Sequence, residues 1–207
     1  MNQFRDHSAA ATVGWVRVAR RFSNVVSPPV IFAILALALA WSELEFWEGL
    51  MWAAVYGFWV SLAPILFVVY LLRKGRISDL HMNTPQERRW PYLVSVLGAV
   101  VALFFILLLD GPDLLRCLAI FSFIELAALA AITNFWMISI HTTSISAALV
   151  IVGLVFGLLP ALLILPLVIL VSWVRLYLRR HTWTQVIAGL VLGVLSVYAV
   201  TLIGCFV

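Results

Sequence analysis

Histidine, arginine and hydroxyl side chains gather in three short polar segments that interrupt an otherwise apolar chain. These segments read KGRISDLHMNTPQERRWPY (74–92), SIHTTS (139–144) and RLYLRRHTWTQ (175–185). A guanidinium group binds two phosphate oxygens through its planar fork, and hydroxyls and helix N-termini add further donors. One histidine can attack phosphorus while a second protonates the leaving oxygen. The residue types therefore indicate phosphoryl transfer.

Acidic residues are scarce in the same segments. Asp79 and Glu87 are the carboxylates that the loops there offer. Metal-assisted hydrolysis of a phosphate needs a cluster of acidic ligands for Mg²⁺, and no such cluster is visible. We therefore expect a covalent mechanism with no metal and no cofactor.

The elements that must position these residues are membrane helices. Hydrophobic residues make up 65% of the chain, charged residues 11%, and the mean hydropathy is +1.13. Apolar runs near 20 residues long are typical of bilayer spans, and backbone groups in hydrocarbon must be paired within helices or closed barrels. Since no period-2 alternation occurs, we predict an all-α fold, a polytopic transmembrane helical bundle of six to seven spans.

The chain divides into two parts. Residues 1–28 form an N-terminal segment whose stretch 13–22 has the pattern of an amphipathic helix lying on the membrane surface. Residues 29–207 form the transmembrane domain. Its spans are predicted at 29–45, 48–72, 93–109, 114–137, 143–158, 161–178 and 184–206.

The apolar runs contain two cysteines, one glutamate and two pairs of spaced glycines, for which we make separate predictions. Cys117 and Cys205 are interpreted as buried small hydrophobic residues and not as a disulfide. Glu125 lies within a span, where a carboxyl group is either functional or hydrogen-bonded across helices, and we favour the second. Glycines at four-residue spacing, Gly153 with Gly157 and Gly189 with Gly193, predict close helix packing within the chain or between copies, so a homo-oligomer stays open.

The distribution of charge predicts the orientation in the membrane. With seven spans, the N-terminal segment and the three polar segments emerge on one face. That face holds twelve of the 13 basic residues: Arg5, Arg17, Arg20, Arg21, Arg73, Lys74, Arg76, Arg88, Arg89, Arg175, Arg179 and Arg180. Arg116 is on the other face. The positive-inside rule predicts a multi-pass protein of the cell membrane with this face in the cytoplasm. A net charge of +4 is too small to suggest a nucleic-acid partner.

Two of the polar segments resemble signatures of the type 2 phosphatidic acid phosphatase (PAP2) superfamily. Arg175, five residues, His181 and three more residues before Gln185 are similar to its third signature. Ser139-Ile140-His141 is similar to the second, and the two short spans between His141 and Arg175 match the family's fold. The loop from Lys74 to Arg88-Arg89-Trp90-Pro91 is loosely similar to the first.

The resemblance implies a PAP2-like core in the helical bundle and a role for each matching residue. His181 would form a phosphohistidine, and His141 would protonate the leaving group. The phosphoryl oxygens would be held by Arg175, Ser139, Arg88 or Arg89, and Lys74. The substrate would be a lipid phosphate or diphosphate of the bilayer, such as phosphatidate, phosphatidylglycerophosphate or a polyprenyl diphosphate.

The chain also departs from the family pattern. Gln185 stands where the family has the aspartate that orients the nucleophile, Ile140 replaces a glycine, and Val174 replaces a serine. Either the amide oxygen of Gln185 accepts the histidine N–H bond with less electrostatic help, or Asp79 or Glu87 takes over.

The sequence also allows functions other than a phosphatase. Gln185 favours one alternative, a weak or inactive relative that binds anionic lipid or diphosphate head groups. His81 is either a contact near the site or a solvated loop residue. A transporter would need polar residues along several spans, and a prenyl transferase would need Asp-rich motifs. Both rank below the phosphatase.

Overall fold

The computed structural model of the protein describes residues 14–77, 82 and 84–207. The helices are α1 (Trp15–Val25), α2 (Pro28–Glu43), α3 (Phe46–Gly57), the π-helix η2 (Phe58–Leu62), α4 (Ala63–Arg73), α5 (Pro85–Leu108), α6 (Asp113–Thr133), α7 (Ile140–Phe156), α8 (Leu158–Tyr177) and α9 (Trp183–Thr201). No strand occurs in this part of the chain. The prediction of an all-α fold is confirmed.

Within the described residues, five helical segments are long and apolar enough to cross a membrane. They are the continuous α3–η2–α4 segment and helices α5, α6, α8 and α9. Helices α1 and α2 together make a sixth, bent by 44° at the break between them. Helix α7 has 17 residues and is shorter, because Gly157 adopts a φ of 91° and ends it. The count is therefore five or six rather than six to seven, and Gly157 ends a helix instead of serving close packing.

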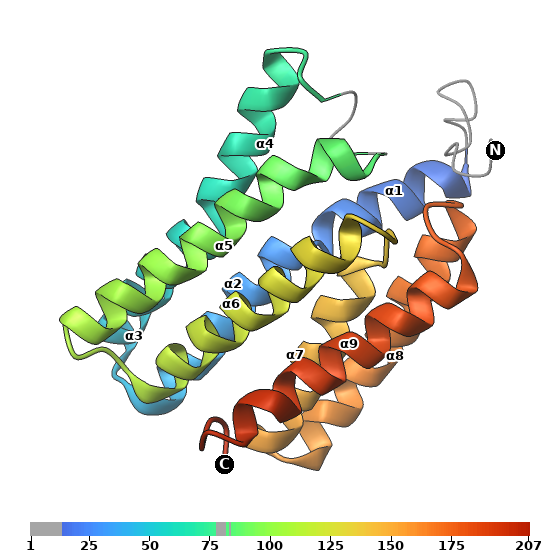
Figure 1. The fold of residues 1–207 in the computed structure, drawn as a ribbon. Coiled ribbons are helices and arrows are strands. Elements are labelled where there is room, and N and C mark those ends of the chain that lie inside the picture. Colours follow the sequence, from blue (N-terminus) through green and yellow to red (C-terminus); the bar gives the residue numbers. More distant parts are fainter. Residues whose placement is uncertain (1–13, 78–81, 83) are drawn as a thin grey trace.

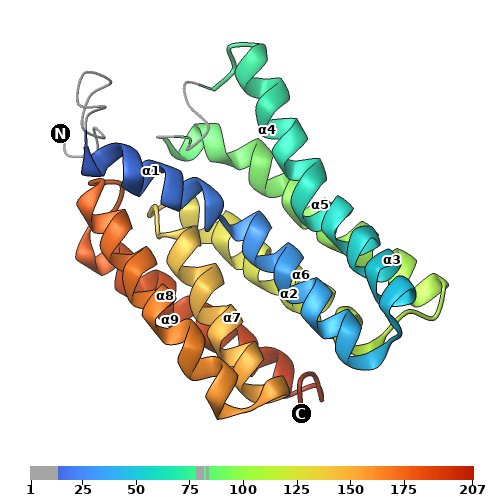
Figure 2. The same ribbon diagram turned by 180° about the vertical axis from the view of Figure 1, so that it is seen from behind.

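The helices lie side by side with alternating directions, so the bundle has two distinct ends (Figures 1 and 2). One end carries α1 together with the starts of α5, α7 and α9. The other end carries the α2–α3, α5–α6 and α7–α8 turns and the segment after α9. The described residues of the three polar segments therefore meet at the end where α1 lies, as the topology predicts. Arg116 is at the opposite end, 2.5 Å from Asp113.

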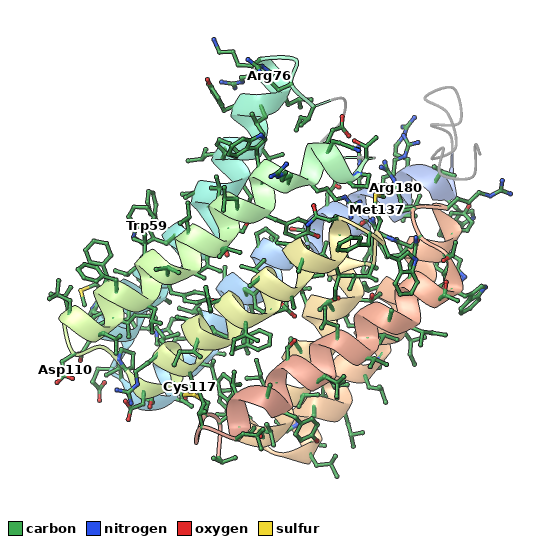
Figure 3. All side chains as sticks on the ribbon, in the orientation of Figure 1. Trp59, Arg76, Asp110, Cys117, Met137 and Arg180 are labelled. Atoms are coloured by element: carbon green, nitrogen blue, oxygen red, sulfur yellow. A yellow bond between two sulfur atoms is a disulfide. The ribbon has the colours of Figure 1, made fainter. Side chains whose placement is uncertain are left out.

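A disulfide joins Cys117 of α6 to Cys205, with the two Cα atoms 5.3 Å apart. The prediction that these cysteines are separate buried thiols is wrong. Each lies in or beside an apolar run, and nothing in the sequence showed that α6 packs against α9 and brings them together. Figure 3 shows Cys117 at the end of the bundle opposite to Met137 and Arg180.

Close packing of α7 against α9 brings two of the polar segments together. A Cβ atom on Gly189 would overlap the Thr142 hydroxyl and the Ser139 carbonyl, and one on Gly193 would overlap the Thr143 carbonyl. The prediction of close packing is confirmed for this pair of glycines, within the chain. The contact fixes the start of α7 against the first turns of α9.

Glu125 is fully buried in the middle of α6. Beside it the hydroxyls of Tyr56 and Ser122 form a hydrogen bond of 2.6 Å. Within the described part of the chain, neither carboxylate oxygen of Glu125 has a hydrogen-bond partner. The cross-helix bond expected for Glu125 is thus made by its neighbours instead.

Candidate active site

Four of the predicted site residues line one cavity of about 400 Å³ at the α1 end of the bundle. Arg88 comes from α5, His141 from α7, Arg175 from α8 and His181 from the turn before α9. All four side chains are buried. Residues from all three polar segments therefore converge on a single space inside the protein.

The rest of the cavity wall is mostly apolar. Its apolar residues include Phe32, Val60, Pro64, Ile65, Val68 and Leu126, from α2, η2, α4 and α6. Of the residues in α4, only Pro64 is buried, so this helix forms an outer wall of the cavity. The cavity therefore has a basic end, with arginine and histidine, and a hydrophobic side bounded by α4.

The ring of His181 is held by a backbone carbonyl. Its Nδ1–H donates to the Met137 oxygen at 3.2 Å, and the Gln185 side chain also hydrogen-bonds the ring. Figure 3 shows Met137 near Arg180, which precedes His181 in the chain. In the neutral ring a proton on Nδ1 leaves a lone pair on Nε2. That tautomer leaves Nε2 able to act as a nucleophile.

Burial lowers the pKa of His181 well below its ordinary value of 6.5, and the positive charges of Arg175 and Arg88 lower it further. The hydrogen bonds to Met137 and Gln185 act in the opposite direction and are weaker. The imidazole is therefore neutral at neutral pH, the state in which it has a lone pair to offer.

Gln185 also caps the start of α9, a structural role that was not predicted from the sequence. It is the third residue of α9 and forms a capping box with Thr182: its Oε1 accepts from the Thr182 N–H at 3.0 Å, and its own N–H donates to Thr182 Oγ1 at 3.4 Å. The pattern Thr-x-x-Gln before an apolar run is the signature of such a box. The Gln185 carbonyl also accepts from the Ser139 N–H at 3.3 Å, which ties α9 to α7.

Of the two adjacent arginines in α5, the structure brings Arg88 to the cavity. Arg88 is 7% exposed, and its Nε donates to the Met82 carbonyl at 2.9 Å. Arg89, the next residue, is exposed on the outside of the helix. A capping box between Thr84 and Glu87 sets this start of α5. Glu87 therefore serves the helix start and not the orientation of His181.

The remaining predicted site residues lie away from the cavity or outside the described residues. Lys74 follows α4 with its Nζ 6.0 Å from the Tyr70 ring centroid, and it lines a separate hollow. Ser139 is the fully buried residue before α7, and its carbonyl accepts from the hydroxyls of Thr142 and Thr143. Asp79 and His81 lie outside the described residues.

Ser23 of α1 is a cavity residue that was not predicted from the sequence. Its Oγ accepts from Arg175 Nη1 at 2.9 Å, and its carbonyl accepts from His141 Nε2 at 3.3 Å. The helical period places Ser23 on the same side as Ala19, and both are buried. Its partners lie 152 and 118 residues away, so no local pattern could have identified them.

Comparison of the chain with protein-family models, curated proteins and solved structures finds no match in any of the three. Among the described residues there is no group of three or more His, Cys, Asp or Glu side chains that could hold a metal ion. The arrangement can bind an anion with two guanidinium groups and present one neutral and one proton-donating imidazole to it. Within the described residues, the fold and the site define an all-helical bundle with five or six candidate membrane-spanning helices and a partly open cavity that has a basic end.

Proposed function

We propose that the protein is an integral membrane phosphatase of the PAP2 type, which hydrolyses a lipid phosphate or diphosphate through a phosphohistidine. The observation that carries this proposal is the single cavity lined by Arg88, His141, Arg175 and His181. These are the side chains that bind phosphate, attack phosphorus and protonate a leaving group. They come from distant segments, and all are buried, where an unused charge would be costly.

The reaction proceeds in two steps. The Nε2 lone pair of His181 attacks phosphorus, a P–N bond forms, and the bond from phosphorus to the lipid oxygen breaks. His141 in its protonated form gives a proton to that oxygen. Water then attacks phosphorus, His141 takes a proton from it, and the P–N bond breaks to release phosphate. Arg88 and Arg175 hold the non-bridging oxygens and stabilise the charge that develops on them.

A lipid substrate fits the two-sided character of the cavity. The basic end would take the phosphate, and the apolar wall would take the first methylene groups of the tail, each contributing about 0.8 kcal/mol. Helix α4, most of whose residues are not buried, bounds the apolar side. In this proposal a lipid reaches the site past α4 from within the bilayer.

Two independent features support a cytoplasmic site. Most of the basic residues lie at the cavity end of the bundle, which the positive-inside rule assigns to the cytoplasm. The disulfide of Cys117 and Cys205 lies at the other end, and disulfides persist in oxidising compartments. In a Cys117→Ser/Cys205→Ser background, a membrane-impermeant maleimide added to intact cells should label Asp110→Cys and spare Arg76→Cys. The reverse pattern would contradict this orientation.

The activity is tested by phosphate release from phosphatidate, phosphatidylglycerophosphate and a polyprenyl diphosphate in EDTA. Release should fall by at least about a hundredfold in His181→Asn, because that variant lacks the nucleophile. The matched control is Arg89→Ala, which changes an exposed residue at the same end of the bundle. Binding of these lipids without any release would instead indicate a non-catalytic lipid-binding protein, the alternative that Gln185 favours.

A further inference from the structure

Ser23 of α1 contacts both of the side chains that would meet the leaving group and the phosphate. The residue is 3% exposed and forms part of the cavity wall. Its hydroxyl accepts a hydrogen bond of 2.9 Å from Arg175, and its backbone carbonyl accepts one of 3.3 Å from His141. Ser23 thus provides one hydrogen-bond acceptor to the Arg175 guanidinium and another to the His141 ring.

These two oxygens compete with a substrate. The Nε2 atom of His141 carries a single hydrogen, so it can donate to the Ser23 carbonyl or to a leaving oxygen, but not to both. Likewise, the Nη1 hydrogen that bonds the Ser23 hydroxyl is not available at the same moment to a phosphoryl oxygen, which leaves Arg175 with one donor fewer of its five. A leaving oxygen that takes the Nε2 proton of His141 must therefore replace the Ser23 carbonyl.

Helix α1 is attached in a way that permits such a replacement. Its buried residues are Ala19 and Ser23; Ala19 packs against Val174 of α8 and against Leu178, which follows that helix, and Val16 and Phe22 are partly buried beside them. At its other end the chain bends by 44° between α1 and α2. A short helix that packs on one side and is followed by a bend can shift with little disturbance of the bundle.

The outer sides of α1 suit the membrane surface. Trp15, Val18 and Val25 are exposed apolar residues, and Arg17 and Arg21 are exposed on a different side of the helix. This combination is typical of a helix at the boundary between head groups and acyl chains. When Ser23 moves out of the cavity, α1 can therefore bind at the membrane surface.

We propose that α1 closes the empty site through Ser23, and that a lipid phosphate head group displaces it on binding. This inference rests on the proposed function for the roles of Arg175 and His141. The resting site is then self-inhibited: the His141 Nε2–H and one Arg175 N–H are occupied by Ser23 until an anion with better acceptors arrives. Charge-assisted bonds to a phosphate are stronger than those to a hydroxyl or a carbonyl.

The test is the affinity for dodecylphosphonate, which has a phosphate-like head group and a lipid tail but no phosphate ester to hydrolyse. Ser23→Ala should bind it about two- to tenfold more tightly than the wild type, because one competing hydrogen bond is gone. Ser172→Ala is the matched control, since Ser172 lies in α8 outside the cavity lining and its hydroxyl donates to the Val168 carbonyl of the same helix, so the affinity of this variant should equal that of the wild type. Equal or weaker binding by Ser23→Ala would overturn the inference.

Hydrogen exchange of the wild-type protein in nanodiscs gives a second, independent measurement. Dodecylphosphonate should increase the exchange of amides in α1 while protecting the start of α7. Unchanged exchange in α1 with the ligand bound would overturn the inference, even if Ser23→Ala failed to fold. If Ser23→Ala gains affinity but no lipid phosphate is hydrolysed, α1 still closes the site and the phosphatase proposal alone falls. If the wild type does not bind dodecylphosphonate, the inference falls, and hydrolysis is decided separately by phosphate release.

Discussion

The Nδ1 atom of His181 lies 3.2 Å from the Met137 carbonyl oxygen, and because a carbonyl only accepts, that nitrogen carries the proton. The orienting partner of the candidate nucleophile is thus a main-chain group. A carbonyl fixes the tautomer as a carboxylate would, but it adds no full negative charge. As a consequence, the neutral form of the His181 ring is favoured. The Met137 carbonyl already orients this neutral ring, so replacing the family's aspartate by Gln185 should change its reactivity little.

The pH dependence of activity should follow from the lowered pKa of His181. The neutral ring is the nucleophile, so activity is retained above this pKa and lost as the pH falls through it. Because the pKa lies well below the ordinary 6.5, the acidic limb of kcat/KM should lie below pH 6.5. A profile of kcat/KM against pH checks this, and a limb above pH 7 would contradict it.

Gln185→Glu should move the same limb to higher pH. Glutamate keeps the reach needed for the capping box with Thr182, so α9 should still begin at the same residue. A carboxylate beside His181 stabilises the protonated ring and should raise its pKa. The expected result is an acidic limb shifted to higher pH, with thermal stability unchanged. A limb that does not move would show that Gln185 and His181 do not interact.

Arg88→Ala and Arg89→Ala should differ sharply. Arg88 lines the cavity, and loss of one positive donor to the transition state costs about 10²- to 10³-fold in kcat. Arg89 is exposed, so its loss should change kcat by less than about threefold. Steady-state phosphate release measures both. Equal losses in the two variants would contradict the assignment of Arg88 to the site.

Much of this site could be predicted because span counting alone brings the three polar segments to one end of the bundle. The choice between Arg88 and Arg89 could not be predicted, since it depends on the rotational phase of α5, which the Thr84–Glu87 capping box and the neighbouring helices set. The role of the Met137 carbonyl could not be predicted either, because every residue has a main-chain carbonyl and the sequence does not indicate which one bonds His181.

The missed disulfide and the missed Ser23 have a different physical origin. Both are contacts between segments more than 80 residues apart. Hydrophobic runs specify that helices exist, but all of them are apolar on most sides, so the pattern does not specify which helices are neighbours. Gly189 is an exception, because a small residue marks a place where another helix comes close.

Reduction of the disulfide should lower stability and leave chemistry intact. The bond closes a loop with a sequence separation of 88 residues, and such a cross-link contributes about 2–4 kcal/mol. Cys117→Ser/Cys205→Ser should therefore unfold at a temperature roughly 5 to 15 °C lower in detergent. Phosphate release at low temperature should be unchanged, because the bond and the cavity lie at opposite ends of the bundle. Loss of activity without loss of stability would argue against this separation.

Glu125→Leu should stabilise the protein. A fully buried carboxyl group without a hydrogen-bond partner among the described residues costs about 1–3 kcal/mol. Leucine has a similar volume and no polar atoms, so the melting temperature in detergent should rise by roughly 2 to 12 °C. Ser122→Ala is the comparison, since it breaks the bond to Tyr56 and should lower the melting temperature. Destabilisation by Glu125→Leu would indicate that Glu125 has a polar partner in the membrane-embedded protein.

The bond between Cys117 and Cys205 can form only late in the synthesis and membrane insertion of the chain. Cys205 follows α9, so the bond cannot form until every helix from α6 to α9 has been synthesised and inserted. A nascent chain that stalls earlier keeps a free thiol at Cys117. The ratio of oxidised to reduced protein in a pulse-chase experiment would then measure how quickly the ribosome and the insertion machinery complete the bundle.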